Sequence, residues 1–156
     1  MKSLEEEIKQ DKFRSEFHKA VINIAVTSNV VRAAINRFLK TFGLSSEQYN
    51  VLRILRGQKG KPASVLLIQE RMMDKMSNAS RLVDKLEQKN LVTRNQCPSD
   101  RRQVEVSITE KGLKLLETID VPLTALENQF DLIPESDLKR VNEVLDIIRN
   151  HYTQQK

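Results

Sequence analysis

The stretch Asp100-Arg101-Arg102-Gln103-Val104-Glu105-Val106-Ser107-Ile108-Thr109-Glu110-Lys111-Gly112 decides the fold of this chain. Apolar β-branched residues occupy every second position from Val104 to Ile108, which is the period-two pattern of a half-buried strand. Upstream, Leu91-Val92-Thr93-Arg94 predicts a partner strand, and Pro98-Ser99-Asp100 has the composition of the turn between them. The sequence therefore predicts a β-hairpin that carries two arginines at its tip.

A short helix is predicted directly before this hairpin, from Met76 to Gln88. Its inward face has apolar residues at i, i+3, i+4 and i+7, namely Ala79, Leu82, Val83 and Leu86. Its outward face carries polar and basic residues: Ser77, Asn78, Ser80, Arg81, Lys85 and Gln88. Another helix is predicted from Ala63 to Met72, with Met73-Asp74-Lys75 as the turn between the two. Two helices followed by a basic hairpin predict a winged helix-turn-helix that binds duplex DNA.

The outward face of the second helix suits contacts with DNA. Asn pairs bidentately with adenine, Arg with guanine, and Ser bonds to either base. The helix start contacts bases in helix-turn-helix docking, so the candidates there are Ser77, Asn78, Ser80 and Arg81. Lys75 and Lys85 are placed to neutralise phosphates. Arg101 and Arg102, at the tip of the hairpin, are further candidates for contacts with DNA. A solvated face without a ligand is the alternative, and the adjacent basic hairpin favours DNA.

Long amphipathic helices are predicted on both sides of this region. The first runs from about residue 11 to residue 42 and has two apolar stripes, as expected of a helix between two partners. Two helices follow the hairpin: one from Glu110 to Asp131, which Pro122 should kink or split, and one that begins near Pro134. The last helix repeats apolar residues at heptad spacing up to Tyr152. This excess of apolar surface predicts a homodimer joined through both ends of the chain.

Several local signals set the ends of these elements. Ser45 and Gln48 form a capping box, Thr109 can cap the helix after the hairpin, and Asn90 can adopt the left-handed conformation at a helix end. Met72, Met73 and Met76 are expected to pack into the helix-turn-helix core.

Composition limits the other possibilities. The chain has 156 residues, a formal charge of +5 and one cysteine, so one domain in a reducing compartment is expected. Between Lys61 and Lys111 there are ten Lys and Arg against seven Asp and Glu. No leader peptide or membrane span is visible, and we expect a cytoplasmic protein. No residues have the spacing of a catalytic site, metal centre or phosphate loop, so neither an enzyme nor a cofactor is expected.

In this order, these elements resemble the MarR family of bacterial transcriptional regulators over essentially the whole chain. The resemblance is sharpest from Ile68 to Gly112. There, Ser80–Arg94 is similar to the family's recognition helix, and the segment that begins at Asp100 is similar to the family's wing. Asn90 and Ile108 depart conservatively from the family's Gly and Leu. The turn Met73-Asp74-Lys75 also lacks the Gly that is often present there.

The resemblance implies a mainly α fold with a small β-hairpin wing, in one domain over residues 1–156. Residues 45–110 would form the DNA-binding lobe, and residues 11–42 and 111–154 the dimerisation helices. It also implies a repressor that binds a pseudo-palindromic operator and is released by a small-molecule effector. In the wing, Arg102 would enter the minor groove, Asp100 would orient the arginines by an ion pair, and Arg101 would contact phosphate.

Two alternatives stay open. A winged helix can serve as a protein-interaction module without DNA contacts, although Arg81, Arg101 and Arg102 favour DNA. Cys97 lies near basic residues that could lower the pKa of its thiol for a redox role, but a thiol without a function is the simpler interpretation.

Overall fold

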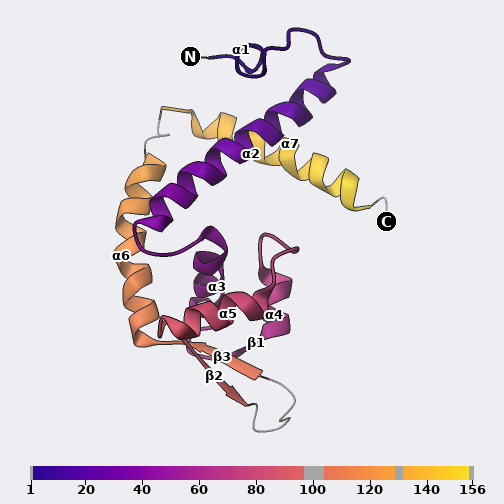
Figure 1. The fold of residues 1–156 in the computed structure, drawn as a ribbon. Helices are drawn as coiled ribbons and strands as arrows, with labels where there is room; N and C mark the ends of the chain where they lie inside the picture. The colour runs from indigo at the N-terminus through magenta and orange to yellow at the C-terminus, as the bar shows by residue number, and fades with distance from the viewer. Residues whose placement is uncertain (1, 97–103, 129–131, 155–156) are drawn as a thin grey trace. The chain divides into compact units, whose positions relative to one another are not determined.

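The computed structural model describes residues 2–96, 104–128 and 132–154 of the chain. Its contacts divide the chain into two units, Met1–Leu116 and Glu117–Lys156. Figure 1 shows the order of the elements. They are α1 (Leu4–Ile8), α2 (Glu16–Lys40), α3 (Ser46–Arg56), β1 (Ala63–Ser64), α4 (Val65–Arg71), α5 (Ala79–Gln88), β2 (Val92–Gln96), β3 (Val104–Ile108), α6 (Glu110–Glu127) and α7 (Glu135–Thr153). The predicted mainly α fold with a small hairpin is confirmed.

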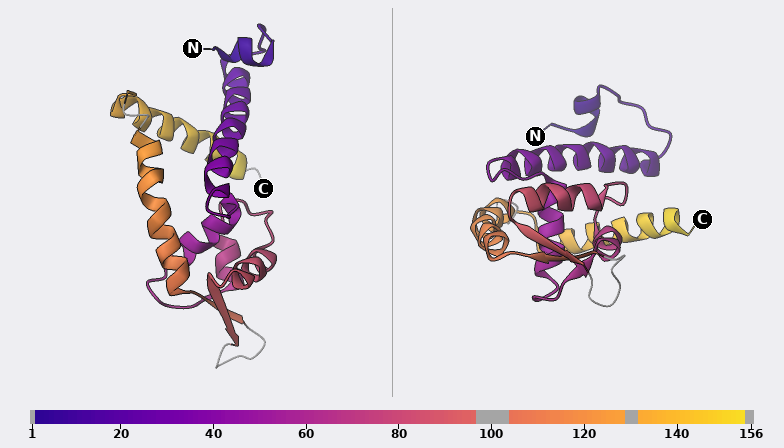
Figure 2. Two further views of the ribbon diagram at one scale, coloured as in Figure 1. Left: turned by 60° about the vertical axis from the view of Figure 1, so that its left-hand side comes forward. Right: turned by 60° about the horizontal axis from the view of Figure 1, so that its bottom comes forward.

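The hairpin forms as predicted and belongs to a larger sheet. β2 and β3 pair antiparallel, with Val92 opposite Ile108 and Gln96 opposite Val104. β1 pairs with the other edge of β3, so the strand order is β1-β3-β2 (Figure 2). β1 was missed because it has only two residues, too few to show a period. The predicted turn at residues 98–100 lies outside the described residues.

In the core of the first unit, this sheet packs against α3, α4 and α5. Val106 of β3 and Val92 of β2 are buried, as are Leu52 of α3, Ile68 of α4 and Val83 of α5. α5 packs against β2 and against both α3 and α4. The predicted inward stripe of α5 is therefore the face that closes this core.

The N-terminal region differs from the prediction. The chain forms a separate short helix, α1, where Ser3 and Glu6 make a capping box. The long helix begins only at Glu16, because the hydroxyl of Ser15 caps it by accepting the His18 N–H at 3.1 Å. The predicted start near residue 11 is therefore wrong. Gly43 follows the end of α2 with a φ of 70°, in the left-handed region that glycine favours.

The start of α3 is confirmed in detail. Ser45 and Gln48 exchange both hydrogen bonds of the capping box, at 3.2 Å each. In the first turn, burial raises the pKa of the Glu47 carboxyl. Hydrogen bonds from Ser45, its own backbone and Ser46 together lower this pKa by more than burial raises it. The pKa of Glu47 therefore lies below its ordinary value of 4.5.

The junction between the sheet and α6 is tight. Thr109 accepts the Gly112 N–H on its hydroxyl at 3.1 Å, so the predicted cap is confirmed. Asn90 has a φ of 58°, the left-handed conformation expected of it. A Cβ added to Gly112 would collide with the Leu91 carbonyl oxygen and lie 2.8 Å from Cγ1 of Ile108. Glycine is thus required at residue 112 by close packing.

The helices after the wing extend into the second unit. α6 continues through Pro122 instead of splitting there. α7 begins at Glu135, so the predicted start near Pro134 is confirmed, although Pro134 is the N-cap and not a residue of the first turn. Among the described residues, no helix combines the length and the apolar character that a bilayer span needs.

Candidate nucleic-acid interface

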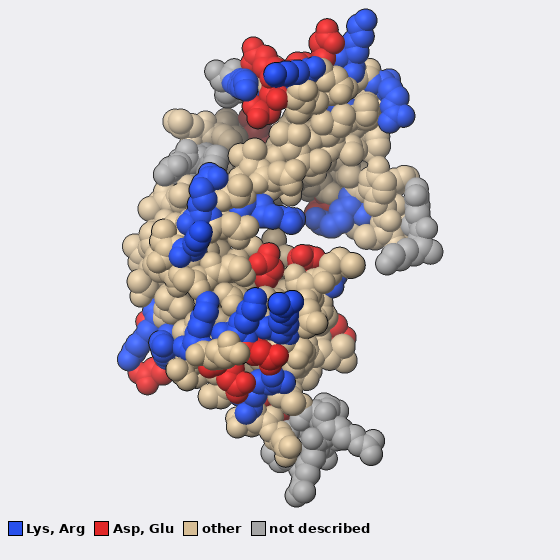
Figure 3. Space-filling model, in the orientation of Figure 1, with Lys and Arg blue, Asp and Glu red and all other residues tan. Residues whose placement is uncertain are grey.

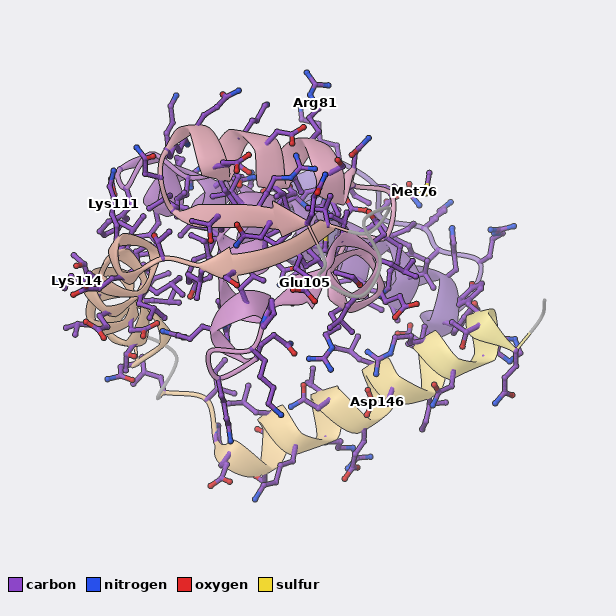
Figure 4. All side chains as sticks on the ribbon, turned by 90° about the horizontal axis from the view of Figure 1, so that it is seen from below. Met76, Arg81, Glu105, Lys111, Lys114 and Asp146 are labelled. Atoms are coloured by element: carbon purple, nitrogen blue, oxygen red, sulfur yellow. The ribbon has the colours of Figure 1, made fainter. Side chains whose placement is uncertain are left out.

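The first turn of α5 is held by Asn78. Its side-chain oxygen accepts the Arg81 N–H at 3.0 Å, which makes Asn78 the N-cap and starts the helix at Ala79. The prediction that this helix begins at Met76 is therefore wrong by three residues. From α5 itself, Ser80, Arg81 and Lys85 are exposed, while Ala79, Val83 and Leu86 on the opposite side are at most 1% exposed. Figure 4 shows the Arg81 side chain extending away from the body of the protein.

The turn between α4 and α5 is built by side chains that accept or donate backbone hydrogen bonds. Asn50 of α3 accepts the Met73 N–H at 2.9 Å. Gln69 of α4 donates to the Lys75 carbonyl at 2.9 Å and accepts the Ala79 N–H at 3.0 Å. These bonds fix the turn without the glycine that is often present there. Sequence analysis missed Asn50 and Gln69, because their partners are up to 23 residues away and leave no periodic signal.

Asp74 organises the second half of this turn. Its carboxylate accepts the Met76 N–H at 2.9 Å and the Ser77 hydroxyl at 3.1 Å. Asp commonly bonds to the backbone two residues further on, so this contact had a usable sequence signal. Ser77 therefore precedes the helix, half-buried, with its hydroxyl donated to Asp74. The Lys75 ammonium donates to the Glu70 carbonyl at the end of α4.

Met73 and Met76 are exposed, contrary to the prediction that they pack into the core. Their side chains are 89% and 93% exposed, whereas Met72 is buried at 1%. The reason is that the turn places only Met72, the C-cap of α4, toward the core. Sequence pattern could not distinguish the three, because residues in a turn follow neither helical nor strand periodicity.

The wing is tied to α5 by an ion pair. Arg94 on β2 donates to the Asp84 carboxylate on α5, with side chains 26% and 47% exposed. This pair was not predicted as part of the site. Because Arg94 neutralises Asp84, the acidic residue adds less negative potential to the surface beside Arg81. The predicted wing residues Asp100, Arg101 and Arg102, and also Cys97, lie outside the described residues.

The C-terminal end of α5 is anchored to the loop after α2 and to α3. The Lys89 ammonium donates to the Gly43 carbonyl at 2.5 Å and to the side-chain oxygen of Gln48 at 3.2 Å. Lys111 donates to the Lys89 carbonyl at 2.9 Å. These two lysines therefore have structural contacts, which leaves Arg81 and Lys85 as the exposed cations of α5 itself. Figure 3 shows Lys and Arg side chains gathered over α5, with acidic side chains among them.

Comparison with known proteins places this arrangement in a family. A model of the MarR family matches residues 44–104. The HTH-type transcriptional regulator MhqR of Bacillus subtilis (strain 168) is 30% identical over 112 residues, which cover 71% of this chain and 76% of that protein.

Solved structures agree with this assignment. CouR from Rhodococcus jostii RHA1, bound to p-coumaroyl-CoA, is 26% identical with a TM-score of 0.72, over 87% of this chain and 95% of that one. Sco3205, a MarR family regulator from Streptomyces coelicolor in complex with DNA, has a TM-score of 0.76 over 91% of both chains. At 20% identity, the second likeness concerns the fold alone. The chain belongs to the MarR family of winged helix-turn-helix transcriptional regulators, a family of regulators and not of enzymes.

Proposed function

We propose that this MarR-family chain is a homodimeric repressor that binds a pseudo-palindromic duplex DNA operator through α5 and the wing. The observation that carries the proposal is the division of α5 into a buried apolar face and an exposed face with Ser80, Arg81 and Lys85. A helix about 10–12 Å across fits the major groove, which is about 12 Å wide. A helix whose core-facing stripe is buried can insert its other face without losing its own packing.

Each predicted site residue has a proposed role. Arg81 contacts guanine, and Asn78 and Ser80 contact base edges beside it. Ser77 is the candidate that the geometry supports least, since its hydroxyl is donated to Asp74. Lys85 and Lys75 contact phosphates, and Lys75 would have to leave the Glu70 carbonyl to do so. In the wing, Arg102 would enter the minor groove, Asp100 would orient the arginines by an ion pair, and Arg101 would contact phosphate.

Exposed apolar side chains support the dimer. On α2, Phe17, Ile24, Val30 and Val31 are between 36% and 58% exposed in the single chain. On α7, the exposed fraction is between 40% and 68% for Leu138, Val141, Val144, Ile147 and Tyr152. Such surfaces are uncommon on monomers, and a stable dimer covers them with interfaces of roughly 2,000 Å² or more. We propose that residues 11–42 and 111–154 form this interface in a single domain, with residues 45–110 as the DNA-binding lobe.

Regulation by a small molecule is part of the proposal. CouR, which has a similar fold, is described in complex with p-coumaroyl-CoA. A ligand that binds the two conformations of the dimer with different affinity would change the distance between the two α5 helices and so the affinity for DNA. We propose this for a cytoplasmic regulator without catalytic activity or a bound cofactor.

Selection of bound sequences from a random duplex pool tests the proposal. The parent should enrich a two-fold symmetric motif. Arg81→Ala should lose roughly 1–3 kcal/mol on that motif and relax the preference at one base pair. Lys85→Ala should weaken all duplexes alike and reduce the slope of log K against log salt by about one.

Lys114→Ala is the charge-matched control. Lys114 lies on α6, away from Arg81 (Figure 4), and pairs with Glu110 at 2.7 Å. Its replacement removes one positive charge without touching α5 and should leave the motif and the affinity nearly unchanged. A pool that enriches no symmetric motif, or an Arg81→Ala variant that loses no more than Lys114→Ala, would contradict the proposal.

A further inference from the structure

Met76 is an exposed apolar side chain in the turn before α5, at the end of that helix that the proposed function directs at DNA. It is 93% exposed and lies two residues before Asn78, the cap of α5. In the view of Figure 4, the labelled side chains of Arg81 and Met76 both lie in the upper part of the molecule. Water around so large an exposed thioether side chain is unfavourable, and its burial against an apolar partner would be favourable.

The backbone at Met76 is fixed, so the side chain leaves the turn in a defined direction. Its N–H donates to the Asp74 carboxylate at 2.9 Å. On one side, the Lys75 carbonyl accepts from Gln69, and on the other the Ala79 N–H donates to the same Gln69 side chain. A residue held on both sides loses little backbone entropy when its side chain is buried by a ligand.

In the major groove, one apolar group distinguishes the bases: the 5-methyl group of thymine. An unbranched thioether with three rotatable bonds adapts well to such a small apolar target. We propose that Met76 contacts a thymine methyl group in each half-site and so contributes to sequence preference. This inference rests on the proposed function, because it requires the start of α5 to lie in the major groove.

Met73 provides a matched control within the same turn. It is also highly exposed, at 89%, but it lies directly after α4 and its N–H is bonded to Asn50 of α3. Met76, by contrast, lies two residues before Asn78, the cap of α5, and so belongs to the end of the turn that leads into that helix. The proposal therefore assigns the thymine contact to Met76 and not to Met73.

Replacing thymine by uracil tests the contact, since uracil keeps every hydrogen-bonding group and lacks only the methyl. Each thymine of the selected operator is changed in turn, symmetrically in both half-sites. Binding is measured by fluorescence anisotropy for the parent, Met76→Ala, Met76→Leu and Met73→Ala. For the parent, uracil at one position should raise Kd roughly fourfold for each methyl contact that is lost.

Met76→Ala should weaken binding to the thymine operator and become insensitive to uracil at that same position. Met76→Leu should keep most of the sensitivity, and Met73→Ala should keep all of it. Equal melting temperatures of parent and Met76→Ala would show that the effect does not come from loss of folding. An unchanged uracil effect in Met76→Ala, or a parent that is indifferent to uracil at every thymine, would overturn the inference.

Affinity for a scrambled duplex separates this result from the proposed function. A parent that prefers the selected operator but shows no methyl contact overturns only the role of Met76. A parent that does not prefer the operator overturns the proposed function and this inference together.

Discussion

Replacement of Asn78 separates two contributions of one side chain: capping of α5 and contact with a base. Its side-chain oxygen accepts the Arg81 N–H at 3.0 Å, and removal of such a cap costs about 1 kcal/mol. Asn78 is exposed, so Asn78→Ala loses little buried surface and the cap dominates the change. For a chain of this length, the melting temperature should fall by about 2–4 °C.

DNA binding adds a second, separable effect. The carbonyl oxygen has two lone pairs and the cap occupies one, so the amide can still pair with adenine. That pairing is worth roughly 1–3 kcal/mol. A loss of about 1 kcal/mol in stability leaves nearly all molecules folded, since the free energy of unfolding of a domain is about 5–15 kcal/mol. Weaker binding by Asn78→Ala would therefore not result from unfolding.

Asn78→Ser is the matched control, because Ser is as good a cap but cannot pair bidentately with adenine. Thermal melts and anisotropy titrations on the selected operator give both quantities. The Ser variant should melt like the parent but, without the bidentate pair, should recover at most part of the affinity that Asn78→Ala loses. If Asn78→Ala melts like the parent, the cap does not hold α5. If Asn78→Ser restores full affinity, Asn78 has no base contact.

Three further predictions concern stability. Asp84→Asn should lower the free energy of unfolding in urea by about 0.5–1 kcal/mol, since the partly exposed pair with Arg94 is screened by solvent. A double-mutant cycle with Arg94→Met that gives no coupling would refute a link between wing and α5. Gly112→Ala should destabilise the protein by about 1–3 kcal/mol, because the added methyl collides with the Leu91 carbonyl. A rise in melting temperature, as helix propensity alone predicts, would disprove this crowding. Because the pKa of Glu47 is lowered on folding, its stabilisation is complete above pH 4.5 and is lost as the pH falls through the lowered pKa. The stability difference between parent and Glu47→Gln should thus shrink on acidification, and a constant difference between pH 6 and pH 3 would contradict the shift.

Local signals in the sequence predicted much of this fold. Alternation from Val104 to Ile108 predicted β3, and the Ser45 capping box predicted the start of α3; both are confirmed. The buried stripe of α5 followed from helical spacing, because a helix on a core must turn one face inward. These features depend on residues within a few positions of one another, and the sequence contains that information directly.

The turn before α5 could not be predicted to the same depth. Its shape depends on Asn50 and Gln69, whose hydrogen bonds bring together residues from α3, α4 and the turn itself. As a result, α5 begins at Ala79 and not at Met76 as predicted, and Met76 lies on the surface and not in the core. Contacts over such separations follow from the packed structure and not from periodicity.

The central claim, two α5 helices acting as one dimer on DNA, is tested most directly by changing the spacing of the operator half-sites. In a dimer of this type, half-sites lie about 10–10.5 base pairs apart or at multiples of that spacing, on one face of the duplex. Insertion of about five base pairs between them turns one half-site to the opposite face. We predict that affinity for the inserted operator falls to that for a single half-site. A second insertion of equal length returns both half-sites to one face of the duplex but does not restore the original distance between them. Equal affinity for the parent and inserted operators would contradict the account.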